Sequence, residues 1–320
     1  MIRTLAILLT LVSSGALGQT WPTRGVTIVV GYAPGGGTDV LARILAKYLA
    51  EPLGQSVTVE NVAGAGGMLG SARVAKAPPD GYQIVVGTRA DAINQTLYKK
   101  PLYDLRTDLV PVVMIADQPN ILLARKDLPV DGLQEFIAHV RKNQSTMTYA
   151  SAGLGSTGHI DCALLNAAIG VNVTHVPYRG GGPAMQDLIA GRVDYICTLS
   201  ATAVPQIEGN RLKGIAVMTQ ERAPFLPNLR GMREQGMPEM DASTWFGLFV
   251  PKGTPDTIVR RLRDATAATL DIKALQDQLL AAGAIVVPTE RRSTEFLRKY
   301  VPVEIEKNGA PIRAAGIQIE

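Results

Sequence analysis

The chain has little of several residue types, and each scarcity excludes a class of protein. Its 320 residues include two cysteines and three histidines, too few for a disulfide scaffold, a four-cysteine zinc site or a histidine-rich metal centre. Charged residues make up 19% and hydrophobic residues 46% of the chain, which excludes a disordered protein. The net charge is +4 and the 32 basic residues form no run longer than two, so nothing indicates nucleic-acid binding.

Long hydrophobic runs are also scarce, and the one at the beginning of the chain is short. Arg3 precedes an apolar run over 5–12, and small residues then lead to Ala16-Leu-Gly18. This order is typical of a signal peptide with its cleavage site, although a buried N-terminal helix is an alternative. No later stretch reaches the ~18 apolar residues that a membrane-spanning helix needs. We therefore expect residues 1–18 to be a signal peptide and the mature protein to be soluble and periplasmic.

Export to an oxidising compartment allows the two cysteines to pair. Cys162 lies early in a predicted helix, and Cys197 lies late in a predicted strand. Their spacing does not say whether the two Cα atoms come within disulfide range. A disulfide and two buried free thiols therefore both remain open.

Glycine and proline are abundant, with 32 and 20 residues, and glycine gathers between predicted strands and helices. The first unit runs from a β-branched strand, Val26–Val30, through a turn into an amphipathic helix that Thr38 and Asp39 are expected to cap. Further strands are predicted over 57–61, 83–87, 147–150, 173–176, 193–197 and 213–218. Strands that alternate with helices predict an α/β fold with mainly parallel sheets, in which ligands bind beyond the carboxyl ends of the strands.

Two apolar stretches without a helix, 110–124 and 243–251, separate the units into two halves. If both stretches cross between halves, they form a hinge with a cleft, which suits a clamshell receptor. The sequence thus predicts one domain from residues 19–122 with 247–320, and a second from residues 123–246.

Most glycine-rich turns follow a strand and precede a helix, which favours a binding role over a structural one. The free N–H groups at a helix N-terminus attract an anion, and glycine lets a ligand approach the backbone. The turns that end at Thr38-Asp39, Ser156-Thr157 and Gly181-Gly182 suit this role. Asp39 argues against a phosphate at the first turn, because its carboxylate repels a dianion.

Several enzyme motifs are incomplete in this chain. The turn over 35–39 lacks the Gly-Lys-Ser/Thr of a phosphate-binding loop, and the turn over 64–67 lacks dinucleotide-binding spacing. Leu154 stands where a nucleophile elbow has its first glycine. Ser156 and His159 lie on one helical turn, which favours a capping or ligand-contact pair. No catalytic residue, metal site or cofactor is expected, and a secreted hydrolase that uses these two residues is the runner-up hypothesis.

Arg89 follows a predicted strand, so it is expected at the edge where a cleft would lie. An arginine binds a carboxylate through two parallel hydrogen bonds. The alternative is a solvated loop arginine that pairs with Asp91. Candidate apolar walls, each equally compatible with a place in the core, are Tyr32, Tyr178, Trp245 and Phe246.

Short motifs in a fixed order carry a family resemblance over almost the whole mature chain. In the first half they are Tyr32-Ala-Pro-Gly-Gly-Gly-Thr-Asp39 with Ala42-Arg43, Glu60-Asn-Val-Ala-Gly-Ala-Gly-Gly67 and Pro79-Asp-Gly-Tyr82. In the second half they are Tyr149-Ala-Ser-Ala-Gly153, Gly155-Ser-Thr-Gly-His159, His175-Val-Pro-Tyr-Arg-Gly180, Pro183-Ala184, Asp187-Leu188 and Gly191-Arg-Val-Asp194. The sequence resembles the Bug-family extracytoplasmic solute receptors of tripartite tricarboxylate transporters.

The resemblance implies a two-domain periplasmic-binding-protein clamshell that carries a small organic carboxylate to a membrane permease, and we expect it to be a monomer. It also implies that the ligand lies between two loops, with one carboxylate held largely by backbone groups and ordered water. The expected ligand-binding residues are Tyr32, Ala33, Pro34, Gly35, Gly36, Gly37, Thr38, Asp39, Arg89, Ser151, Ala152, Gly155, Ser156, Thr157, His159, Tyr178 and Thr198.

Two departures from the family pattern bear on the ligand. Many relatives carry small polar residues where this chain has Arg89-Ala-Asp91, and Pro227-Asn-Leu-Arg230 replaces a usual Asp-Val-Pro-Thr. Arg89 motivates the hypothesis of a second carboxylate on the ligand. An aliphatic C4–C6 diacid, citrate and an aromatic diacid remain open, as does coupling to a sensor instead of a permease.

Overall fold

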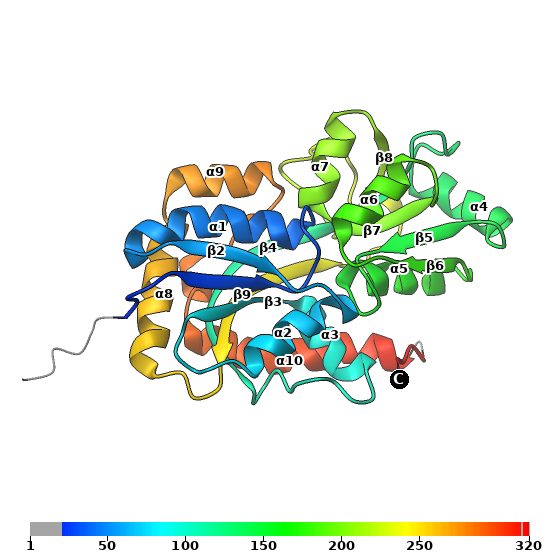
Figure 1. Ribbon diagram of the computed structural model, residues 1–320. Coiled ribbons are helices and arrows are strands. Elements are labelled where there is room, and N and C mark those ends of the chain that lie inside the picture. Colours follow the sequence, from blue (N-terminus) through cyan, green and yellow to red (C-terminus); the bar gives the residue numbers. More distant parts are fainter. Residues whose placement is uncertain (1–20, 315, 320) are drawn as a thin grey trace, which may run out of the picture.

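The computed structural model describes residues 21–314 and 316–319 (Figure 1). The predicted signal peptide lies outside the described residues. The first half of the chain forms β1 (Val26–Val30), α1 (Gly37–Leu53), β2 (Val57–Asn61), α2 (Met68–Ala75), β3 (Gln83–Thr88), α3 (Arg89–Leu97), β4 (Leu109–Arg125) and α4 (Leu133–Asn143). The second forms β5 (Thr148–Ser151), α5 (Thr157–Ala168), β6 (Thr174–Pro177), α6 (Gly181–Ile189), β7 (Tyr195–Leu199), α7 (Ser200–Glu208), β8 (Leu212–Val217), β9 (Ser243–Pro251), α8 (Asp256–Leu270), α9 (Lys273–Ala281), β10 (Ile285–Val286) and α10 (Thr294–Ala314).

The strands form one continuous sheet in the order β2-β1-β3-β9-β4-β7-β5-β6, and β8 and β10 also pair with β4. At one end β1 pairs in parallel with β2 and β3, and at the other β5 pairs in parallel with β6 and β7. Between these two parallel groups lie β9 and β4, which pair antiparallel with each other. β9 also pairs antiparallel with β3, and β4 with β7. The prediction of an α/β fold with mainly parallel groups and two crossing stretches is confirmed.

The sheet is covered on both faces, so each half has an apolar cluster on either side of its strands. In the first half, Leu45 of α1 packs with α8 and α9 on one face, while Leu297 of α10 packs with α2 on the other. Figure 1 shows α1 and α9 on one side of the strands and α2, α3 and α10 on the opposite side. In the second half, Leu165 of α5 and Leu188 of α6 belong to separate clusters. This two-sided burial explains why the parallel strands have continuous apolar sequences.

The long strand β4 connects the halves because it changes partners along its length. Its residues up to Pro119 pair with β9, and its residues from Asn120 onward pair with β7. The domain boundaries expected from the sequence, at 122/123 and 246/247, fall inside β4 and β9. Because neither strand is interrupted there, the boundaries stay a prediction. Within the described residues, none of the helices has the length and apolar character that a membrane crossing requires.

One local prediction is wrong, and one alternative interpretation is excluded. The helix α1 has Gly36 as its N-cap, without a side-chain cap, so Thr38 and Asp39 do not cap it. Arg89 does not lie in a solvated loop, because it is the first residue of α3. That helix begins in a capping box, in which the Thr88 side chain accepts from Ala90 N and Asp91 Oδ2 accepts from Thr88 N. Asp91 therefore caps α3 and does not pair with Arg89.

Candidate ligand-binding site

A pocket lies where the two halves meet, beyond the carboxyl ends of β3, β5 and β7. It has an empty volume of about 440 Å³, part of which is open to solvent. Residues from both halves line it: Tyr32, Gly36, Gly37, Thr38, Thr88, Ala152, Ser156, Thr157, Gly158, Gly181, Cys197, Thr198, Leu199 and Thr244. Its position agrees with the expectation that ligands of such folds bind beyond the strand ends.

Three helices begin at this pocket. The first residues of α1, α5 and α6, which are Gly37, Thr157 and Gly181, all belong to its wall. The first N–H groups of a helix have no partner within the helix, and the helix dipole adds a partial positive charge there. The pocket therefore presents N–H donors from both halves to an anion.

The hydroxyl of Ser156 caps α5 by accepting a hydrogen bond from the backbone N–H of His159 at 3.3 Å. The contact is made by the main chain of His159 and not by its imidazole, whose Nδ1 accepts from Gly155 N at 3.2 Å. The Ser156 hydroxyl hydrogen stays available to a ligand. Ser156 and His159 thus form a capping pair, and their geometry is not that of a nucleophile and its base.

The pocket wall carries no charged side chain among its described residues. None of its described lining residues is Lys, Arg, His, Asp or Glu. Tyr32 is the one titratable residue among them, and burial raises the pKa of its phenol far above the usual value. Its hydroxyl donates to the carbonyl oxygen of Gly66 at 2.7 Å. An anion in this pocket would therefore be held by N–H and hydroxyl dipoles.

Asp39 lies outside the pocket wall and holds the loop before α1. Its Oδ2 accepts from Gly35 N at 3.0 Å and from Arg43 Nε at 2.9 Å, and its Oδ1 accepts from Asn61 Nδ2 at 2.8 Å. Burial raises the pKa of Asp39, but the hydrogen bonds from Arg43, Gly35 and Asn61 outweigh it and hold this pKa below the usual value. The carboxylate therefore anchors the loop to β2.

Glycines allow the two halves to touch around the pocket. A Cβ atom on Gly66 would lie 2.3 Å from the carbonyl oxygen of Leu154, across the boundary between the halves. A Cβ atom on Gly180 would lie 2.8 Å from Ala33 N, which donates to the carbonyl oxygen of Arg179 at 3.0 Å. Side chains at these glycines would hold the loops apart. Glycine at these positions therefore allows the loops of the two halves to come into contact around the pocket.

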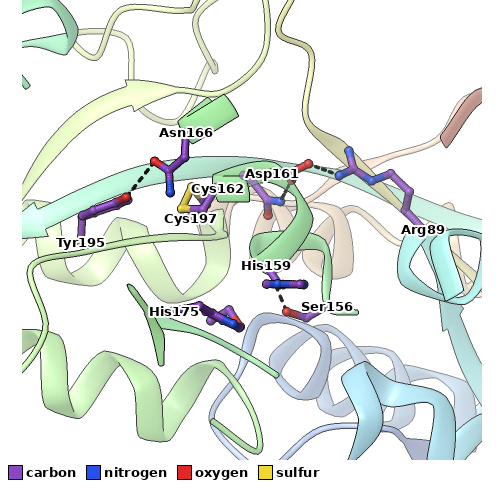
Figure 2. Close-up of a disulfide and its surroundings, with 11 residues drawn as sticks. Arg89, Ser156, His159, Asp161, Cys162, Asn166, His175, Tyr195 and Cys197 are labelled. Carbon is purple, nitrogen blue, oxygen red and sulfur yellow. Dashed lines mark hydrogen bonds and ion pairs between the residues drawn. A yellow bond between two sulfur atoms is a disulfide. The ribbon is translucent and has the colours of Figure 1, made fainter. Parts of the chain in front are cut away.

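A disulfide joins Cys162 of α5 to Cys197 of β7, with their Cα atoms 5.6 Å apart (Figure 2). The question that the sequence left open is settled in favour of pairing. Cys197 lines the pocket, and a Cβ atom on Gly158 would lie 2.0 Å from its carbonyl oxygen. The start of α5 is therefore held close against the end of β7.

A stack of rings lies behind the start of α5. The imidazole of His159 stacks on His175 with centroids 4.3 Å apart, and His175 stacks on Tyr149 at 4.7 Å. Burial lowers the pKa of His159 to about 4 and that of His175 to about 3, so both are neutral at pH 7. Ser151 Oγ lies 2.8 Å from His175 Nε2. Ser151 and His159 thus support the loop between β5 and α5.

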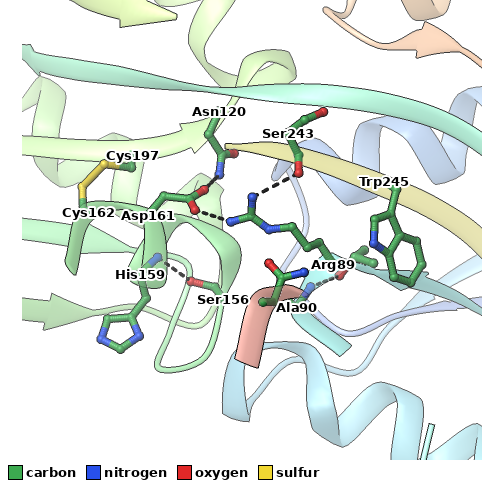
Figure 3. Close-up of polar contacts among 12 residues, drawn as sticks. Arg89, Ala90, Asn120, Ser156, His159, Asp161, Cys162, Cys197, Ser243 and Trp245 are labelled. Carbon is green, nitrogen blue, oxygen red and sulfur yellow. Dashed lines mark hydrogen bonds and ion pairs between the residues drawn. A yellow bond between two sulfur atoms is a disulfide. The ribbon is translucent and has the colours of Figure 1, made fainter. Parts of the chain in front are cut away.

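Arg89 is buried between the halves and does not line the pocket. Figure 3 shows its guanidinium pointing toward Asp161 and Ser243. One guanidinium nitrogen pairs with Asp161 of α5, and another donates to the carbonyl oxygen of Ser243 at 3.1 Å. Asp161 also accepts from Asn120 Nδ2. The guanidinium that was expected to meet a ligand carboxylate instead meets a carboxylate of the protein.

The structure brings about half of the predicted ligand-binding residues together. The wall contains Tyr32, Gly36, Gly37, Thr38, Ala152, Ser156, Thr157 and Thr198. Predicted residues outside the wall are Ala33, Pro34, Gly35, Asp39, Arg89, Ser151, Gly155, His159 and Tyr178. Wall residues absent from the predicted set are Thr88, Gly158, Gly181, Cys197, Leu199 and Thr244. The glycine-rich turns indicate a binding role for the segments that contain Gly158 and Gly181. No local sequence pattern predicts that Thr244 lies in the pocket wall.

Comparisons with known proteins indicate the family and the fold of this chain. A model of the TctC family, the tripartite tricarboxylate transporter family receptor, matches residues 41–317. The chain is similar to the periplasmic binding protein BugD, at 35% identity and a TM-score of 0.92, over 94% of this chain and 100% of that one. It is similar to MatC from Rhodopseudomonas palustris with bound malate, at 38% identity and a TM-score of 0.88, over 91% and 100% of the two chains.

A third solved structure, R. palustris Rpa4515 with adipate, is 36% identical with a TM-score of 0.88, over 93% of this chain and 99% of that one. These neighbours confirm the two-domain periplasmic-binding-protein clamshell. Together with the family match, they show that the chain belongs to the receptor family of the tripartite tricarboxylate transporters.

Proposed function

We propose that this protein is a periplasmic receptor that captures a small dicarboxylate in the pocket and delivers it to a tripartite tricarboxylate transporter permease. The observation that carries the proposal is the meeting of three helix N-termini at one uncharged pocket. Carboxylates are acceptors only, and this wall offers N–H and hydroxyl donors. The family description supports delivery to a permease.

The preference for two carboxylates is supported by the neighbours. MatC was solved with malate and Rpa4515 with adipate, which are both dicarboxylates. The N-termini of α1 and α6 approach the pocket in addition to that of α5, so a second carboxylate has donors without a cation. Arg89 does not support this preference, because its guanidinium is engaged by Asp161.

Calorimetric titration of the mature protein with monocarboxylates, dicarboxylates and tricarboxylates tests the binding step. Dicarboxylates are expected to bind most tightly and to raise the unfolding temperature. A ligand at 100 times its Kd stabilises the folded state by about 2.7 kcal/mol. If no carboxylate releases heat or shifts the unfolding temperature, the proposal is wrong.

Delivery is tested separately with vesicles that contain the permease subunits. Labelled dicarboxylate should accumulate in the vesicles only when the receptor is added. A receptor that binds the ligand but leaves uptake unchanged would contradict the permease step and would favour coupling to a sensor.

A further inference from the structure

Two polar side chains lie opposite each other on the central strands beside the pocket. In the antiparallel pair β4–β9, Gln118 is directly opposite Thr244. Residues at such paired positions point to the same face of a sheet, with Cβ atoms about 4.5–5.5 Å apart. Thr244 lines the pocket, so Gln118 lies on the pocket side as well. A Cβ atom on Gly37, another wall residue, would lie 3.3 Å from Gln118 Oε1.

Both side chains are buried, and neither makes a hydrogen bond to the residues that the structure describes. Gln118 is 0% exposed and Thr244 is 1% exposed. The Nε2 and Oε1 atoms of Gln118 and the Oγ1 atom of Thr244 have no partner within the described part of the chain. A buried polar group without a partner destabilises a protein by about 1–3 kcal/mol. Three such atoms beside a ligand pocket indicate that a bound molecule supplies their partner.

The chemistry of these atoms specifies that partner. The amide of Gln118 and the hydroxyl of Thr244 offer both donors and acceptors, and neither carries a charge. A carboxylate accepts only, so it would leave Gln118 Oε1 without a partner. A hydroxyl donates one hydrogen bond and accepts two. A ligand hydroxyl can therefore donate to Gln118 Oε1 and also accept a hydrogen bond from Thr244 Oγ1 or Gln118 Nε2.

We infer that Gln118 and Thr244 form a hydroxyl subsite, which makes the preferred ligand a hydroxylated dicarboxylate. The inference rests on the proposed function of the pocket and adds the chemical class of its ligand. The helix N-termini bind the carboxylates of the ligand, and Gln118 and Thr244 bind a hydroxyl group on the carbon chain of the same ligand. A site that is built to bind a substrate hydroxyl discriminates strongly against the analogue without it, since its polar groups are then left unpaired.

Calorimetric titration with matched pairs of diacids tests this inference. The pairs are succinate with 2-hydroxysuccinate, glutarate with 2-hydroxyglutarate, and adipate with 2-hydroxyadipate. For the chain length that binds best, the hydroxylated member should bind at least about tenfold more tightly, which corresponds to about 1.4 kcal/mol. In Thr244→Val and in Gln118→Met, this affinity ratio should fall toward one.

Thr266→Val is the matched control. The Thr266 hydroxyl on α8 is also buried and has no partner among residues 21–314 and 316–319, but it does not belong to the pocket wall. This variant should keep the wild-type ratio. Removal of a buried unpaired polar group should also leave each apo variant at least as stable as wild type in thermal unfolding, so folding failure is not expected.

Two results separate failure of this inference from failure of the proposed function. Equal affinity for both members of every pair in the wild-type protein would mean that a resident water occupies the subsite, and would overturn the inference alone. A ratio that survives in both variants would overturn it as well. Binding of no diacid of any kind would overturn the proposed function, and the hydroxyl subsite with it.

Discussion

At the scale of single residues, the site depends on glycines, because a residue without a side chain leaves its backbone N–H group accessible to a ligand. Gly36 precedes the first residue of α1, and its Cα faces the start of α6. Gly36 and Gly181 both belong to the pocket wall, so a ligand oxygen in the pocket can lie against both helix N-termini. Backbone donors cannot be removed by substitution, but access to them can be blocked by a methyl group.

We therefore expect Gly36→Ala to weaken carboxylate binding at least about tenfold. The φ angle of Gly36 is −81°, which alanine adopts easily, and its Cβ would stand 3.4 Å from Gly181 N. The fold is kept while a donor is covered. Calorimetric titration measures the loss.

Gly132→Ala is the control for this variant, because Gly132 is also a helix N-cap, on α4, and a Cβ there would have no neighbour closer than 3.7 Å. It should bind like wild type. Unchanged affinity in Gly36→Ala would show that the ends of α1 and α6 do not hold the ligand.

At the scale of elements, α5 brings a helix N-terminus and its N-cap to the pocket wall from the second half. It supplies Thr157 and Gly158 to the wall, with Ser156 as its N-cap. Two devices fix its first turns: the disulfide to β7 and the ring stack against β5 and β6. Each gives a prediction about stability.

Removing the disulfide with the double variant C162A/C197A should lower the free energy of unfolding by about 2–4 kcal/mol. The bond links residues 35 apart in sequence, so its loss frees a long loop in the unfolded chain. Urea denaturation measures the change. The unreduced wild-type protein should show no thiol when it is denatured in the presence of a thiol reagent, and detection of two thiols would contradict the pairing.

The ring stack makes stability depend on pH. His159 and His175 have folded pKa values lowered to about 4 and about 3, below the ordinary value of 6.5. The unfolded chain therefore binds more protons, and stability is full above pH 6.5 and is lost as the pH falls toward 4. The limiting slope is about 1.4 kcal/mol per pH unit for each histidine. Urea denaturation between pH 4.5 and 7 measures it.

His175→Phe keeps a stacking ring without a titratable group, so the slope in this pH range should decrease. The carboxyl of Asp39, whose pKa is lowered, loses its stabilising effect only at lower pH. A wild-type free energy of unfolding that is constant from pH 7 to 4.5 would contradict the burial of these imidazoles.

Local sequence patterns predict some of the helices and strands but not others. Local patterns predicted β1, the glycine turn and most of α1, because apolar periodicity and glycine placement are local signals. They do not predict α3, because they place Arg89 in a segment that follows a strand, although Thr88 and Asp91 form a capping box at the start of a helix. Thr244 and Gln118 could not be found, because their adjacency depends on a pairing between strands more than 120 residues apart.

At the scale of the whole molecule, the two halves are joined by a buried ion pair as well as by strands. Arg89 lies on α3 in the first half, and Asp161 lies on α5 in the second. The pair is separated by 72 residues, so the sequence could not reveal it. It connects the half that contains α1 to the helix that supplies Thr157, and so it positions the two sides of the pocket.

Arg89→Ala should lower the free energy of unfolding by about 3–5 kcal/mol, because it leaves Asp161 buried without its partner. Adding Asp161→Ala should restore part of this loss, since the double variant has no unpaired charge there. Lys299→Ala is the control: it breaks an exposed pair with Glu295, which contributes at most about 1 kcal/mol. Urea denaturation of wild type, Arg89→Ala, Asp161→Ala and the double variant gives the coupling between Arg89 and Asp161.

Ligand binding distinguishes positioning from direct contact. If Arg89 positions α5, the single variant weakens monocarboxylates and dicarboxylates by the same factor, and the double variant regains part of the affinity for both. A guanidinium that bound the second carboxylate would instead be needed for dicarboxylates alone, and Asp161→Ala would restore nothing. Selective loss of dicarboxylate binding in Arg89→Ala would therefore overturn the positioning role. Equal loss would place Arg89 in the connection between the halves, with ligand capture left to the backbone and hydroxyl groups of the pocket.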